Sequence, residues 1–187
     1  MGALCCALKP RDLQADALAI VSRNISTIRS ETEKPFVCSV QTQLVRICLN
    51  NMAVAVHSCP TAAFDFERIF KVLDALSRNG KITPFLHVRT AMMRVLLSVE
   101  ACGEQILRAP QFLRASVQLL DAFIAAEYYA VGFRTYADVR AQLVLLMQRF
   151  WPANTRPYAH WIHTPFTTAC TSPACPPQLR CALLDAE

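Results

Sequence analysis

The stretch FERIFKVLDAL, residues 66–76, shows most clearly how this chain folds. Its apolar side chains recur at the spacing i, i+3, i+4 and i+7, which places them on one face of an α-helix. They are Phe66, Ile69, Phe70, Leu73 and Leu76. The same spacing returns in residues 88–99 and 139–150, and no comparable stretch alternates apolar and polar residues as a half-buried strand would. The sequence therefore predicts an all-α protein.

Proline, glycine and capping residues divide the rest of the chain into segments of helical length. Thr32, the Thr83-Pro84 pair, and Thr135 with Asp138 are typical of helix N-termini. We place helix starts near residues 12, 33, 61, 84, 110 and 135. Six helices favour a compact bundle. Because alternate starts are about 50 residues apart, close to helical-pair repeats of roughly 40–47 residues, a short armadillo- or HEAT-like stack is the alternative.

One predicted helix, residues 40–59, is apolar around nearly its whole circumference, and Arg46 is its only charged residue. A helix that is apolar all round normally lies in the centre of its bundle. We therefore expect residues 40–59 to form the buried central helix.

The chain divides into three regions: an N-terminal segment of residues 1–11, a helical domain of residues 12–150, and a C-terminal tail of residues 151–187. The tail contains six of the 11 prolines of the chain. It shows no helical period before residue 178, so we expect a largely extended, Pro- and Cys-containing tail that docks on the helices in places.

Composition limits the class of protein and its partners. With 53% hydrophobic and 18% charged residues, the 187-residue chain is not disordered. The net charge of +5 is spread along the sequence, whereas a nucleic-acid binder concentrates its basic residues, so we expect no nucleic-acid partner. Nine cysteines, an odd number with no secretory signal before them, predict reduced thiols in the cytoplasm. No segment is apolar enough to span a membrane.

The first seven residues, MGALCCA, are the most specific functional signal. Removal of the initiator methionine exposes Gly2 for myristoylation, although Cys6 stands where Ser or Thr is preferred. Cys5 and Cys6 are candidate palmitoylation sites, which supply the second lipid that stable anchoring needs. Lys9 and Arg11 then face acidic headgroups, each contributing about 1 kcal/mol. This start resembles the N-terminus of many dually acylated proteins.

Metal and cofactor signals are weak. His160, His163, Cys170 and Cys175 offer ligand types that suit zinc, but the wide cysteine spacing and the prolines around it argue against a site. Residues 75–86 have the spacing of a calcium-binding loop but lack its two essential carboxylates, because Ala75 and Leu86 stand at the first and twelfth positions. We therefore expect no metal and no cofactor.

Signals of catalysis are missing from the sequence. The four glycines are too far apart for a phosphate-binding loop, and there is no Gly-x-Ser-x-Gly motif. Asp121 and Glu127 lie on different turns of one predicted helix and form no carboxylate pair. We therefore expect a protein that is not an enzyme.

These observations favour a non-enzymatic helical adaptor, attached to the cytosolic face of a membrane by its acylated N-terminus. Its body would bind a protein partner in trafficking, signalling or viral assembly. Aromatic residues are enriched at interface centres, and they mark the expected partner surface. These residues are Tyr128, Tyr129, Phe133, Trp151, Tyr158 and Trp161. The alternative is a soluble helical scaffold subunit of an obligate protein complex, without lipid.

Overall fold

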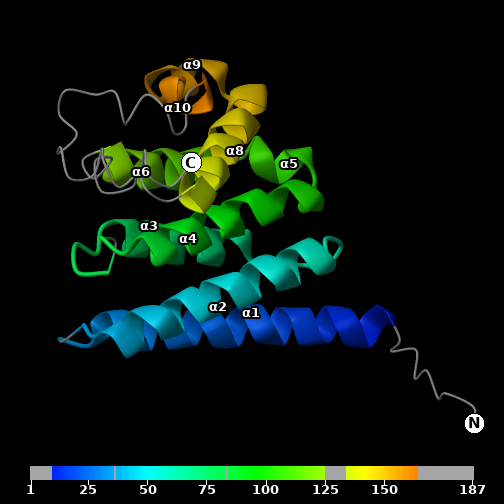
Figure 1. Ribbon diagram of the computed structural model, residues 1–187. Helices are drawn as coiled ribbons and strands as arrows, with labels where there is room; N and C mark the ends of the chain where they lie inside the picture. Colours follow the sequence, from blue (N-terminus) through cyan, green and yellow to red (C-terminus); the bar gives the residue numbers. More distant parts are fainter. Residues whose placement is uncertain (1–9, 36, 83, 125–133, 164–187) are drawn as a thin grey trace, which may run out of the picture.

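The computed structural model describes residues 10–35, 37–82, 84–124 and 134–163, and within these ranges the chain is helical and contains no strand (Figure 1). The longer helices there are α1 (Pro10–Glu33), α2 (Ser39–Ser58), α3 (Phe66–Ser77), α4 (Leu86–Ser98), α6 (Pro110–Ile124) and α8 (Arg134–Phe150). Shorter helical segments are η1 (Val99–Cys102), α5 (Glu104–Leu107), α9 (Pro152–Thr155), η2 (Arg156–Tyr158) and α10 (His160–His163). The predicted all-α fold is confirmed.

The helices pack in two rows. Helices α1, α3 and α6 follow one another in one row, and α2, α4 and α8 follow one another in the other. Helices α1 and α2 also pack closely as an antiparallel pair, and Figure 1 shows this pair at one end of the molecule with α9 and α10 at the other. The helices therefore form a compact all-α fold in which two rows pack against each other.

The first helix boundary differs from the prediction. Helix α1 runs through Glu33, and α2 begins only at Ser39. The Thr32 hydroxyl, expected to cap a new helix, instead donates to the Arg29 carbonyl oxygen inside α1 at 2.8 Å. Helix α1 ends close to Pro35 because a proline disfavours helical backbone in the residue before it.

The other helix starts lie within a few residues of their predicted positions. Helix α3 begins five residues late because the Asp65 carboxylate caps it, accepting a hydrogen bond from the Arg68 N–H at 3.0 Å. Helix α4 begins at Leu86, while the cap predicted at position 83 lies outside the described residues. Helix α6 begins at Pro110 as predicted, and α8 already includes Arg134, one residue before the expected cap.

The central helix is α4, and the expectation that residues 40–59 occupy the centre is wrong. Nine of the 13 residues of α4 are buried, because α2 packs against one side of it and α8 against the other. Helix α2 has α4 on one side of its row, and its other side carries exposed apolar residues. An apolar circumference therefore did not identify the central position.

The start of the predicted tail is packed and helical. Segments α9, η2 and α10 lie against α8, and Thr155, Tyr158 and Trp161 belong to the buried interior. The part of the tail that the structure describes is thus not extended, and residues 164–187 lie outside the description.

Candidate partner-binding surface

The predicted lipid anchor lies before the first described helix. Gly2, Cys5, Cys6 and Lys9 fall outside the described residues, and Arg11 is the second residue of α1. Within the described ranges, no helix combines the length and the apolar character that crossing a bilayer requires.

The predicted aromatic partner surface is largely internal where it can be seen. Tyr158 and Trp161 are only 2% and 1% exposed, so they belong to the core, and the expectation that they form an open surface is wrong. Trp151 is half-buried, and its indole N–H donates to the Leu107 carbonyl oxygen at 2.8 Å. The remaining members of the predicted set lie outside the described residues: Tyr128, Tyr129 and Phe133.

Trp161 is held by a buried group of aromatic rings and arginines. The Arg140 guanidinium lies 4.3 Å from the centre of the Trp161 ring and 5.4 Å from that of Tyr136. The Tyr158 ring stacks on Trp161 at 5.5 Å, and Arg89 is buried beside Tyr136. Burial raises the pKa of the Tyr136 hydroxyl, while the two arginines oppose that shift. Cations on aromatic faces stabilise a buried contact, so this group fixes α10 to α8.

A second contact ties the same segment to α6. The Tyr158 hydroxyl donates to the Asp121 carboxylate at 2.5 Å. Burial and this carboxylate together raise the pKa of Tyr158. Tyr158 therefore stays protonated at neutral pH and serves as a structural donor.

The described cysteines and histidines do not gather into a metal site. Burial raises the pKa of the Cys48 and Cys102 thiols, which keeps them protonated and weakly nucleophilic at neutral pH. No group of three or more His, Cys, Asp and Glu side chains lies together as a metal site in the described part of the chain. His160 is exposed beside the Trp161 ring. The other zinc candidates lie beyond this description: the His163 side chain, Cys170 and Cys175.

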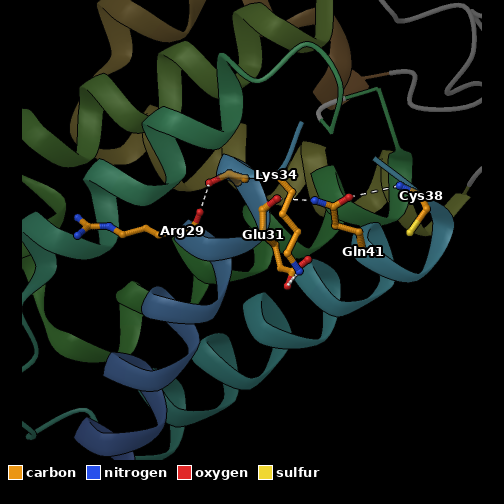
Figure 2. A network of polar contacts seen from close by, with 6 residues as sticks. Arg29, Glu31, Lys34, Cys38 and Gln41 are labelled. Carbon is orange, nitrogen blue, oxygen red and sulfur yellow. Dashed lines mark hydrogen bonds and ion pairs between the residues drawn. The ribbon is translucent and has the colours of Figure 1, made fainter. Parts of the chain in front are cut away.

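A polar network holds the turn between α1 and α2 (Figure 2). The Gln41 side chain donates to the Glu31 carbonyl oxygen and accepts from the Cys38 N–H at 3.3 Å. The Lys34 ammonium group lies 2.5 Å from the buried Glu31 carboxylate. These contacts fix the start of α2 against the end of α1, beside an open cavity of about 440 Å³.

Helix α2 carries a line of exposed, mostly aliphatic side chains. Val40, Leu44, Ile47 and Val54 are 73%, 36%, 45% and 65% exposed, and Asn51 is exposed between them. These five residues are spaced by four, three, four and three positions, so they form one line along the helix. We call this line the α2 stripe.

The α2 stripe faces away from the rest of its row. Thr42, Leu49 and Val56 lie on the opposite side of the helix and are buried. The Thr42 backbone lies beside His87 of α4, and the Cys102 thiol of η1 lies 3.8 Å from the Val56 carbonyl oxygen. At 3.6 residues per turn, the stripe is about half a turn away from this packed side.

Sequence reasoning missed the stripe because it treated all apolar positions of residues 40–59 as one buried set. Heptad spacing alone does not separate them, because a buried line of α2 shows the same alternation of threes and fours. That line consists of Thr42, Val45, Leu49, Met52 and Val56. The exposed line differs in carrying Asn51, an amide, among its aliphatic residues. A line of heptad spacing that includes an Asn is typical of a helix-pairing surface.

Comparison with protein-family models, with curated proteins and with solved structures found no match to this chain. Function is therefore inferred from the residues and their geometry.

Proposed function

We propose that this protein is a non-enzymatic helical adaptor, held on the cytosolic face of a membrane by acyl chains at Gly2 and at Cys5 or Cys6. Its helical body binds a protein partner in trafficking, signalling or viral assembly. The observation that carries the proposal is the MGALCC start, which places an acylatable glycine three residues before two adjacent cysteines. Helix α1 begins at Pro10, so a short segment joins these residues to the body.

The physical chemistry of anchoring explains why both kinds of lipid matter. A single myristoyl chain binds a bilayer only marginally and reversibly, and a second chain makes the attachment stable. Lys9 and Arg11 add electrostatic attraction of about 1 kcal/mol each at an acidic surface. Because a thioester is reversible, palmitate at Cys5 or Cys6 would set how long the protein stays on the membrane.

The exposed α2 stripe supports an adaptor role for the body. Contiguous apolar surface on a small domain usually marks a site of interaction with another molecule. A body that contacts a partner through such a surface needs no catalytic group, which agrees with the protonated thiols described above.

The test is the intact mass of the protein purified from eukaryotic cells, before and after hydroxylamine, which cleaves thioesters. We expect loss of the initiator methionine, a myristoyl increment that Gly2→Ala removes, and a hydroxylamine-sensitive palmitoyl increment that Cys5→Ser with Cys6→Ser removes. Cys38→Ser is the matched control and should leave both increments in place. An unmodified mass, with the protein in the soluble fraction, would overturn the anchor.

The second candidate is a soluble scaffold subunit of an obligate complex, without lipid. The observation that favours it is the same α2 stripe, because a chain with an apolar face open to water is suited to hide that face in a partner. Cell fractionation separates the candidates. The adaptor moves from membranes to the soluble fraction with Gly2→Ala and Cys5→Ser/Cys6→Ser, whereas the subunit is unaffected by these changes.

A further inference from the structure

We propose that the α2 stripe is the surface at which two copies of this chain pair, with α2 of one copy against α2 of the other. The row α2, α4, α8 would then continue into the same row of the second copy. This pairing does not depend on acylation, so it can be tested with the lipid sites removed.

The direction of the stripe is the first argument. The inner helix of this row, α4, is covered on both sides, by α2 and by α8. Helix α8 is in turn covered by α9 and α10 at its end of the molecule. Among the described residues, the α2 end of the row carries a line of exposed aliphatic side chains, which face the position that a further helix would occupy, whereas α8 at the other end exposes the single aliphatic Leu145.

Stacks of helical pairs normally finish on a polar outer face, because an apolar end invites another helix to add to it. Here the end carries Val40, Leu44, Ile47 and Val54 instead. A second copy that presents the same end covers both surfaces at once and closes the assembly through a two-fold axis, which stops further growth.

The charge of the surface favours a second copy over other occupants. Arg46 is the only Lys, Arg, Asp or Glu in α2, and it lies toward α4. The positions beside the stripe are Gln43, Asn50 and His57. The stripe and these neighbouring positions of α2 carry no Lys, Arg, Asp or Glu, and the nearby Lys34 ammonium group is paired with the Glu31 carboxylate. Such a surface attracts neither an acidic headgroup layer nor a strongly charged protein. It does allow two chains of net charge +5 to meet without like charges facing each other.

Asn51 gives the stripe a group that can recognise its own copy. An amide side chain holds both a donor and an acceptor, so two of them across a two-fold axis can satisfy each other. A single Asn in a line of apolar heptad positions fixes the register of paired helices at some cost in stability.

The neighbouring flank of α1 extends the surface. Glu31 lines a cavity together with Val40 and Leu44, so the side of α1 that carries Glu31 borders the stripe. The exposed Ile20 and Leu13 lie 11 and 18 residues before Glu31, which places them on that side. Stable interfaces bury roughly 800 Å² per partner. One line along a 20-residue helix is a narrow contact, so this flank of α1 should take part.

The experiment measures the mass in solution of the full chain that carries Gly2→Ala, Cys5→Ser and Cys6→Ser, by light scattering and sedimentation over a range of concentrations. We expect a species of twice 20.9 kDa. Ile47→Glu should weaken pairing about a hundredfold or more, since two carboxylates would meet at the centre of the stripe. Leu145→Glu on α8 is the matched control, because Leu145 and Ile47 are both 45% exposed, and it should leave the dimer intact.

A rescue experiment keeps the result separate from misfolding. In a parallel pair with Asn51 facing Asn51, Ile47 lies one helical turn away on the same line and also faces its own counterpart. Mixing the Ile47→Glu and Ile47→Lys chains should therefore restore a dimer that neither forms alone. A monomer at every concentration, a dimer unaffected by Ile47→Glu, or equal loss with Leu145→Glu would each overturn the proposal. None of these outcomes bears on the lipid anchor.

Discussion

Replacing Trp161 by alanine tests whether the helical segments after Phe150 are part of the folded body. Trp161 is almost completely buried, its ring stacks on Tyr158 at 5.5 Å, and the Arg140 guanidinium lies over it at 4.3 Å. The substitution removes all of these contacts and leaves a cavity beside a buried cation. It should therefore reduce stability far more than a change in an extended tail would.

The size of the loss follows from the burial. Removing a buried tryptophan side chain costs about 3–5 kcal/mol. The lost contact with the buried guanidinium puts Trp161→Ala at the upper end of that range, because a desolvated cation–π pair contributes about 2 kcal/mol. For a chain of this size, a loss of about 4 kcal/mol lowers the melting temperature by roughly 8–16 °C. Trp161→Phe keeps an apolar ring under Arg140 and should cost less than half as much.

The measurement is urea and thermal unfolding followed by far-UV circular dichroism, which does not depend on tryptophan fluorescence. Arg156→Ala is the control, since Arg156 is exposed in the same segment and its removal should change stability by no more than about 0.5 kcal/mol. If Trp161→Ala and a chain ending at Phe150 both unfold together with the wild type, then residues 151–163 do not stabilise the body and the reasoning fails.

Three further predictions concern single contacts. Burial and the neighbouring carboxylate raise the pKa of Tyr158 in the folded state. Its contribution to stability is therefore full below the unfolded pKa of about 10 and is lost as the pH rises above that value. Tyr158→Phe should cost about 1 kcal/mol in urea titrations at neutral pH and should reduce the loss of stability at alkaline pH. Gly103 has a φ of +108°, so Gly103→Ala should lower the free energy of unfolding by about 1–2 kcal/mol, whereas Gly80→Ala should have little effect. Gln41→Ala removes two hydrogen bonds to the backbone of the α1–α2 turn. It should lower the free energy of unfolding by about 1–2 kcal/mol and the melting temperature by a few degrees, whereas Gln43→Ala on the exposed side of α2 should lower neither.

Local periodicity predicted the helices well because it depends on the residues of each helix alone. In α3 the predicted apolar face is buried, with Ile69, Leu73 and Leu76 inside the core. The position of a helix among its neighbours is a different property, since it depends on what packs on each side. Helix α4 occupies the centre although it carries Arg89 and Thr90, both of which are buried. Composition therefore predicted α2 as the central helix, whereas the packing of the neighbouring helices makes α4 the central one.

The tail shows a second limit of sequence reasoning. Its prolines indicated an extended chain, but Pro152 and Pro157 lie in the first turns of α9 and η2, where a missing N–H costs nothing. The proposed interaction surface was missed for a related reason. Whether an apolar residue such as Val54 is buried or exposed depends on which helix ends the row. Heptad spacing within one helix does not show which helix that is.

Pairing through α2 and acylation at the N-terminus would reinforce each other. A chain with one myristoyl group attaches to a bilayer only marginally, but a dimer brings two such groups to the same surface. The second insertion is then intramolecular and occurs at a high effective concentration, so the pair is retained much longer than either chain alone. Membrane residence of a chain without palmitate would therefore depend on its concentration, while palmitate at Cys5 or Cys6 would remove that dependence. Under the two proposals together, the exposed apolar end of the helical row would couple the number of copies to the strength of the anchor.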